Sequence, residues 1–156
     1  MDNISVIEVK PQRVIGLRQK GSYRLIAELF PRLFQFAMEN NIQIAGHPLF
    51  ICHEITKEEV KKADAEGTAD VEVAVPIAGD IEGSGDIACY ELPGGKMVKT
   101  IHKGPYHACE PTYDKLYKWI NENGKKICGP VRETYLNSPA EVSEEELITE
   151  IFAPIE

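Results

Sequence analysis

The stretch Lys20-Gly21-Ser22-Tyr23 decides the fold, because the chain repeats it as Lys103-Gly104-Pro105-Tyr106. A shift of 83 positions lays residues 4–55 on residues 87–138 without a gap and gives ten identities in 52 positions. Chance alone gives about three at average composition. The sequence therefore predicts two copies of one structural unit.

Each copy begins with two extended segments that are separated by proline or glycine. These interruptions are Lys10-Pro11 in the first copy and Pro93-Gly94-Gly95 in the second. Such residues favour a turn or a bulge. Because the interruptions are short, we expect the two segments of each copy to pair antiparallel with each other. The segments are Ile4–Val9 and Arg13–Gln19, then Ile87–Leu92 and Lys96–His102.

A helix follows the Lys-Gly-Xaa-Tyr corner in each copy. Apolar residues at i, i+3, i+4 and i+7 predict it. Pro31 lacks an N–H group, so the first helix is expected to begin near that residue. Pro111 and Thr112 mark the second start. The two stripes consist of Phe30, Leu33, Phe34 and Ala37, and of Tyr113, Leu116, Tyr117 and Ile120.

Two further strands complete each copy after the helix. The pattern therefore predicts an α+β fold from a duplicated βαββ unit with pseudo-twofold symmetry. Its eight strands form an antiparallel sheet, and two main helices cover one face. We expect one domain over residues 1–156, with repeats at about 2–79 and 85–156 and a ligand groove between them. The last strands are Pro48–His53, Val71–Ile77, Val131–Leu136 and Leu147–Pro154.

Composition narrows the classes of partner. The 156 residues are 43% apolar and carry a formal charge of −8, which disfavours nucleic acid and anionic membranes but tolerates a neutral or cationic small ligand. No stretch is apolar enough to span a bilayer, and the N-terminus does not read as a signal peptide. We expect a cytoplasmic protein whose four cysteines are reduced thiols.

One position breaks the repeat in a way that suggests chemistry. Glu133 stands where the first copy has Phe50, and Tyr135 stands where it has Cys52. Strand alternation places Glu133 and Tyr135 on one face, with Phe50 and Cys52 on the equivalent face of the other copy. Phe50 is therefore a further candidate ligand contact. The Glu133 carboxylate can hold a cation, accept a ligand hydrogen bond or act as a general base. The alternative is a glutamate that faces water or pairs with Arg132 or Arg13.

Aromatic residues gather in the second copy. Trp119 lies off the helix stripe and is a candidate for the rim of the groove, and Tyr90 gains a hydroxyl where the first copy has Ile7. Tyr106 repeats Tyr23, so a structural corner and a ligand contact are both open. Tyr113 and Tyr117 share the helix stripe and are expected to pack in the core.

Other common site chemistries find no support in the sequence. His102 and His107 are five residues apart across a corner, which is not the spacing of paired metal ligands on a helix. No serine lies in a Gly-x-Ser-x-Gly elbow. Residues 83–85 (Gly-Ser-Gly) are too short for a phosphate loop. We expect no metal and no cofactor.

The chain resembles the GyrI-like family, which includes the effector-binding domains of AraC-type and BmrR-type transcription regulators. The resemblance covers nearly the whole chain and implies the duplicated βαββ fold. Its most specific part is the Arg-Glu-Thr-Tyr-Leu-Asn-Ser-Pro run. The matching stretches are Gly104–Tyr106, Tyr117–Ile120, Gly129–Pro139 and Glu150–Ile155.

The resemblance implies a ligand site at Glu133 that takes bulky hydrophobic, often cationic molecules, with Tyr135 and Trp119 as pocket walls. It suggests a stand-alone sensor or sequestering protein. A hydrolase of reactive cytotoxins, with Glu133 activating water, and an inhibitor of the gyrase-inhibitor type remain alternatives. The repeat fills the chain from Ile4 to Ile155, so no direct nucleic acid binding is expected. A protein partner and any oligomeric state stay open.

Overall fold

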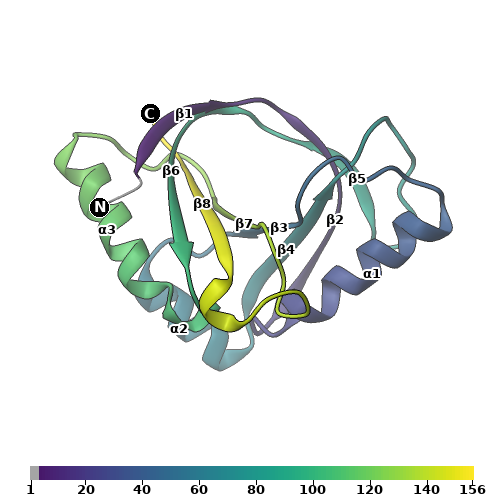
Figure 1. Ribbon diagram of the computed structural model, residues 1–156, viewed down its shortest axis with the longest axis horizontal. Helices are drawn as coiled ribbons and strands as arrows, with labels where there is room; N and C mark the ends of the chain where they lie inside the picture. The colour runs from purple at the N-terminus through teal and green to yellow at the C-terminus, as the bar shows by residue number, and fades with distance from the viewer. Residues whose placement is uncertain (1–3) are drawn as a thin grey trace. The chain divides into compact units, whose positions relative to one another are not determined.

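The computed structural model describes residues 4–156 and contains eight strands, three α-helices and two short 3-10 helices (Figure 1). The predicted start of the first repeat at residue 2 lies outside the described residues. Backbone contacts divide the chain into two units. Unit 1 holds the chain up to Val9 and from Gly94 to Glu156, and unit 2 holds Lys10–Pro93.

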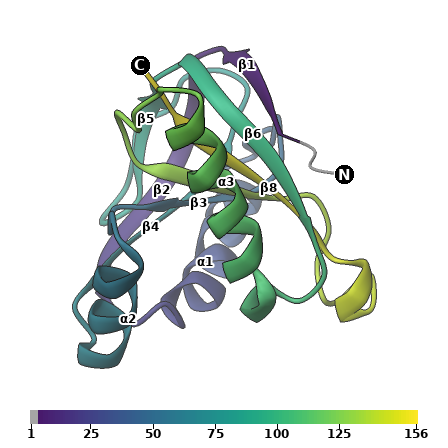
Figure 2. The same ribbon diagram turned by 90° about the vertical axis from the view of Figure 1, so that its left-hand side faces the viewer.

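Unit 1 contains four antiparallel strands in the order β1-β6-β8-β7. Helix α3 (Glu110–Glu122) packs on β6, and Figure 2 shows the two elements side by side. Leu116 and Ile120 of α3 are buried in one apolar cluster with Val98, Ile151 and Ala153 of the strands. The strands are β1 (Ser5–Val9), β6 (Gly95–Lys103), β7 (Val131–Tyr135) and β8 (Ile148–Pro154).

Unit 2 repeats this arrangement with the order β3-β4-β2-β5. Helix α1 (Leu25–Glu39) packs on β2 and β4, and Leu29, Leu33 and Ala37 are its buried residues. The expected α+β class, with a duplicated βαββ unit and eight antiparallel strands, is confirmed. The strands are β2 (Gln12–Gly21), β3 (Leu49–Cys52), β4 (Ala69–Pro76) and β5 (Ala88–Leu92).

The expected pairing of the first two segments of each copy is wrong. Strand β1 pairs with β6, and β5 pairs with β2, so the two copies exchange their first strands. A two-residue hairpin needs a positive φ at its first central residue. Lys10 and Pro93 hold these positions, neither has a positive φ, and proline cannot adopt one. The interruptions are therefore crossings between the units.

The expected start of the first helix near Pro31 is also wrong, since α1 begins at Leu25 and contains Pro31. Proline in a helix removes one hydrogen bond to the carbonyl four residues earlier. Here that carbonyl belongs to Ala27, and both residues are exposed, so water can reach the freed group. The buried face of Leu29, Leu33 and Ala37 holds the helix together across the proline.

Helix α2 (Lys57–Glu66) lies in the loop that lengthens the first copy and was not predicted. The Thr56 hydroxyl accepts a hydrogen bond from the Glu59 backbone N–H at 3.1 Å, and Glu59 accepts one from the Ile55 N–H. Gly67 ends the helix in the left-handed conformation. The Thr-x-x-Glu start and glycine stop are a sequence signature of a helix. In the second copy the run Glu144–Glu146 forms an exposed 3-10 turn.

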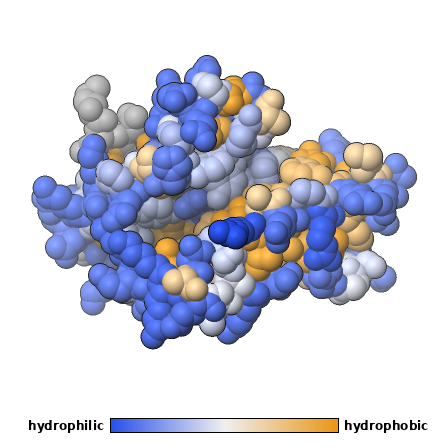
Figure 3. Space-filling view, turned by 90° about the horizontal axis from the view of Figure 1, so that it is seen from below, coloured by the Kyte–Doolittle hydropathy of each residue, from blue (hydrophilic) through white to orange (hydrophobic). Residues whose placement is uncertain are grey.

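The surface is mixed in polarity. Figure 3 shows one face on which hydrophilic side chains (blue) are widespread and hydrophobic ones (orange) occur among them. Met38 is 78% exposed and Ile55 is 76% exposed. All four cysteines are free thiols. Among residues 4–156, no helix has the length and apolar character needed to cross a membrane.

Candidate functional site

The Glu133 carboxylate of β7 lies between two phenol groups in unit 1. The Tyr113 hydroxyl, from α3, donates a hydrogen bond to Glu133 Oε2. The Tyr135 hydroxyl donates to Oε1 at 2.9 Å. Strand alternation brings Tyr135 to the same face as Glu133, and this face points toward α3. The Glu133 side chain thus lies on the helix-facing side of unit 1, and Arg13 forms an ion pair with Asp80.

Aromatic rings surround this carboxylate. The Tyr106 ring meets the Tyr135 ring edge-on, with centroids 5.3 Å apart, and Tyr106 is 41% exposed. Burial, reinforced by the negative charge of Glu133, holds the pKa of Tyr135 well above its ordinary value. The same two causes raise the pKa of the Cys109 thiol to about 12. Tyr135 and Cys109 therefore stay protonated and uncharged at neutral pH.

His102 fixes the corner that presents Tyr106. Its Nε2 lies 2.9 Å from the Pro105 carbonyl oxygen, and its Nδ1 lies 2.9 Å from the Thr112 hydroxyl. Since a carbonyl only accepts, Nε2 donates this hydrogen bond. His102 is buried and uses both ring nitrogens. It thereby joins β6 to the start of α3.

The structure brings together only some of the predicted site residues. Tyr135 and Tyr106 lie at Glu133, whereas Trp119 packs partly buried against the apolar core cluster of unit 1. Phe50 and Tyr90 lie in unit 2. Phe50 is buried against the edge of the Tyr23 ring.

Tyr113 is also a hydrogen-bond partner of the Glu133 carboxylate, whereas the helix stripe predicted only a role in core packing. It does pack against the core cluster, but its hydroxyl reaches Glu133. The repeat held the relevant information. The first copy has Phe30 where the second has Tyr113, and Phe50 where the second has Glu133. The second copy thus gains a hydroxyl and a carboxylate together.

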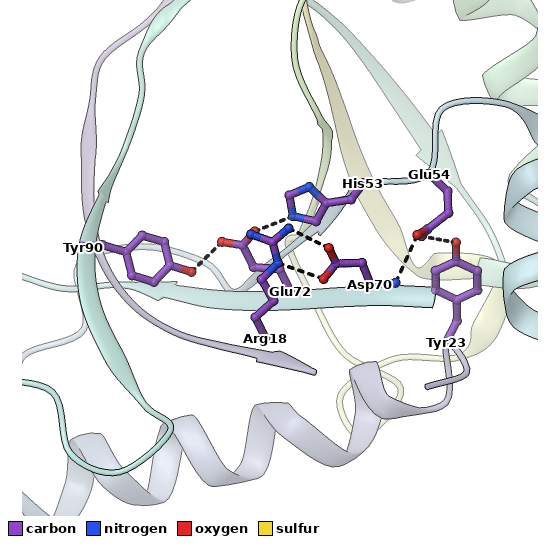
Figure 4. A network of polar contacts seen from close by, with 7 residues as sticks. All are labelled: Arg18, Tyr23, His53, Glu54, Asp70, Glu72 and Tyr90. Atoms are coloured by element: carbon purple, nitrogen blue, oxygen red, sulfur yellow. Dashed lines mark hydrogen bonds and ion pairs between the residues drawn. The ribbon is translucent and has the colours of Figure 1, made fainter. Parts of the chain in front are cut away.

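A second carboxylate with a tyrosine partner, Glu72 of β4, is buried and was missed in the sequence. It is 7% exposed and lies in unit 2 (Figure 4). The Tyr90 hydroxyl donates to Glu72 Oε2 at 2.6 Å, and His53 Nε2 lies 2.6 Å from Oε1. Burial and the bond to Glu72 raise the pKa of Tyr90. Tyr90 therefore has a carboxylate partner of its own, in the other unit from Glu133.

Gly16 makes room for this contact. A Cβ atom on Gly16 would lie 2.1 Å from the Tyr90 hydroxyl oxygen, so only glycine lets the ring cross β2. The repeat matches Gly16 to Lys99 and Glu72 to Glu150. In unit 1, Lys99 and Glu150 form an ion pair at 2.6 Å.

An ion pair and a tyrosine extend the Glu72 network toward solvent. Arg18 donates two hydrogen bonds to Asp70, at 2.8 and 2.6 Å, and these bonds hold the pKa of Asp70 below its ordinary value. The Tyr23 hydroxyl donates to Glu54, which also accepts from the Asp70 backbone N–H (Figure 4). The network is internally satisfied, as a stabilising polar cluster should be.

Solved structures share this fold. The crystal structure of the EcmrR C-terminal domain has a TM-score of 0.88 at 22% identity, covering 100% of this chain and 98% of that one. A protein named SAV2435, bound to tetraphenylphosphonium, has a TM-score of 0.60 at 16% identity, with coverage of 99% and 94%. A hydrolase from Listeria innocua has a TM-score of 0.69 at 12% identity, with coverage of 98% and 91%.

The EcmrR chain in the cryo-EM structure of the EcmrR-DNA complex in EcmrR-RPo has a TM-score of 0.86 at 22% identity. The match covers 99% of this chain and 57% of that longer chain. At these identities the likeness shows a common fold. No curated protein matches the sequence. The family model for the GyrI-like small molecule binding domain matches residues 2–156, so the chain belongs to the GyrI-like family.

Proposed function

We propose that the protein binds small hydrophobic, often cationic molecules at Glu133 and acts as a sensor or a sequestering protein. One observation carries the proposal. A carboxylate is held by the hydroxyls of Tyr113 and Tyr135 beside the ring of Tyr106. A cation gains from the negative charge and from the faces of the aromatic rings.

Preorganisation supports the proposal. Both carboxylate oxygens of Glu133 accept hydrogen bonds from phenol hydroxyls. These hydroxyls hold the carboxylate in one position but bring no positive charge to it. Removing the charge should weaken a bound cation by about tenfold or more, because charges near a protein surface interact with about 4 kcal/mol at 4 Å. The net charge of −8 favours the approach of cations.

Calorimetric titration with tetraphenylphosphonium tests this function. We expect saturable binding to the wild-type protein and a loss of about tenfold or more in Glu133→Gln. Glu150→Gln is the matched control, because Glu150 is a partly buried strand carboxylate of the same unit that pairs with Lys99 on the other sheet face. Equal affinity of wild type and Glu133→Gln would exclude Glu133 as the ligand carboxylate.

Hydrolysis of reactive cytotoxins is the alternative, with Glu133 as a general base. Water activation would require Glu133 to give up one of its two phenol hydrogen bonds. The raised pKa of Tyr135 also makes it a weak proton donor for a leaving group. Both points favour binding over turnover. Turnover of a cyclopropane-bearing alkylator that is lost in Glu133→Gln would reverse this preference.

A further inference from the structure

Thr149 of β8 holds a buried hydroxyl that the fold does not use. The residue is 0% exposed, and its Oγ1 has no hydrogen-bond partner among residues 4–156. A buried hydroxyl without a partner costs about 1–3 kcal/mol. Buried polar groups in native proteins are nearly always paired, so this one calls for an explanation.

The sheet register places Thr149 in the candidate site. It lies directly opposite Tyr135 of β7 and opposite His102 of β6. Directly opposite residues of an antiparallel pair share a sheet face. That face is the one toward α3, because Ile151, two residues further along β8, packs with Leu116. Glu133 is the diagonal neighbour, at about 7–8 Å by usual strand geometry.

Neither neighbouring side chain satisfies Thr149. The Tyr135 hydroxyl is directed to Glu133, 2.9 Å away. Both ring nitrogens of His102 are engaged, by Pro105 and by Thr112. The hydroxyl of Thr149 therefore keeps its hydrogen-bonding capacity for a ligand group, which reaches it only when the covering side chains move, because the residue is 0% exposed.

The repeat shows that the scaffold does not need this hydroxyl. The first copy has Val71 at the matching position, and Val71 is also 0% exposed. Valine and threonine have the same shape and differ only in the polar oxygen. The second copy thus exchanges a methyl group for a hydroxyl in the same unit that exchanges Phe50 for Glu133.

We propose that the Thr149 hydroxyl is a hydrogen-bonding subsite of the Glu133 site, which rests on the proposed function. It selects a particular class of ligand, namely an aromatic cation that also carries a hydrogen-bonding amine, hydroxyl or carbonyl group. Glu133 receives the positive charge, and Thr149 receives the second polar group. Cations without hydrogen-bonding atoms use Glu133 alone.

Two cations separate these contributions in titrations of the wild type, Thr149→Val, Thr149→Ser and Glu133→Gln. Ethidium carries ring amines, whereas tetraphenylphosphonium has no hydrogen-bonding atom. We expect Thr149→Val to weaken ethidium binding about threefold to tenfold, the worth of one hydrogen bond, and to leave tetraphenylphosphonium within about twofold. Thr149→Ser keeps the hydroxyl and should retain most of the ethidium affinity.

The unfolding temperature of the ligand-free variants gives a second, independent reading. If the hydroxyl serves only the ligand, Thr149→Val is as stable as wild type or more stable. A clear fall in its unfolding temperature shows that the hydroxyl is part of the fold, through a bound water, and overturns the subsite. Unchanged ethidium affinity in Thr149→Val overturns it as well. If Glu133→Gln binds both cations as wild type does, or wild type binds neither, the proposed function itself fails.

Discussion

The helix-facing sides of the two units share a scaffold but differ in chemistry. Leu33 and Leu116 are identical and fully buried in both. Around them, unit 2 is apolar where unit 1 is polar. The matched pairs are Phe30 and Tyr113, Phe50 and Glu133, Cys52 and Tyr135, Val71 and Thr149, and Leu17 and Thr100. The two units therefore share one backbone arrangement, and unit 1 alone has several polar side chains beneath its helix.

The other sheet face shows the reverse asymmetry. In unit 1, Glu150 pairs with Lys99, which is an ordinary partly exposed ion pair. In unit 2, the matched Glu72 is paired with Tyr90 and His53, and glycine replaces the lysine. Tyr90 packs with an apolar cluster of strand residues that contains no residue of α1. Each unit thus has a carboxylate bound by tyrosine hydroxyls, on a different face of its strands, and Glu72 is the more buried of the two.

The largest expected effect tests the shared scaffold. Leu33→Ala and Leu116→Ala each remove a fully buried side chain from the helix core. Each should cost about 2–5 kcal/mol in the free energy of unfolding, and the two costs should be similar. Denaturant unfolding followed by circular dichroism measures both. A cost in one variant below half that in the other would show that the two frames are not equivalent.

The next effect breaks the Glu72 arrangement. Gly16 has no positive φ, so Gly16→Ala would ordinarily stabilise by up to about 1 kcal/mol. Here the new Cβ displaces the Tyr90 hydroxyl and unpairs Glu72, so we expect a loss of about 2–3 kcal/mol.

A double-mutant cycle is the control for that prediction. Tyr90→Ile introduces the residue that unit 1 has at the matching position, Ile7. In this background the clash is gone, and Gly16→Ala should cost less than about 1 kcal/mol. Additive costs of the two changes would show that Gly16 does not act through Tyr90.

The sequence predicted the scaffold and one of the two asymmetries. Ten identities marked the repeat, and the exchange of Phe50 for Glu133 marked the polar side of unit 1. The strand exchange was not predicted, because pairing between distant segments leaves no local pattern. Glu72 was missed for a related reason. It is identical to Glu150 in the repeat, and only its neighbours Gly16 and Tyr90 make it unusual.

Helix α2 offers a smaller test, because it occurs in the first copy alone. Thr56→Ala removes the hydroxyl that caps the Glu59 N–H and should cost about 1 kcal/mol. Hydrogen exchange should speed up at the α2 amides, with little change at α3. Thr56→Ser keeps the cap and should behave as wild type. Equal loss of protection in α2 and α3 would mean that the cap stabilises more than its own helix.

The smallest expected effect concerns pH and the Arg18–Asp70 pair. Hydrogen bonds from Arg18 hold the pKa of Asp70 below 3.8 in the folded protein. The unfolded chain therefore binds this proton first as the pH falls. The contribution of the pair is complete above about pH 4 and disappears as the pH falls through the folded pKa. Arg18 is 56% exposed, which limits this contribution to less than about 1 kcal/mol.

Asp70→Asn isolates this contribution, because asparagine keeps the size of the side chain and does not titrate. Urea unfolding of both proteins should show wild type the more stable at pH 7 and at pH 5, with the gap closing toward pH 3. Unit 1 has Ile101 and Ile148 at the positions that match Arg18 and Asp70, so this titration belongs to unit 2 alone. A gap that stays constant down to pH 3 would show that the charge of Asp70 does not cause the difference in stability.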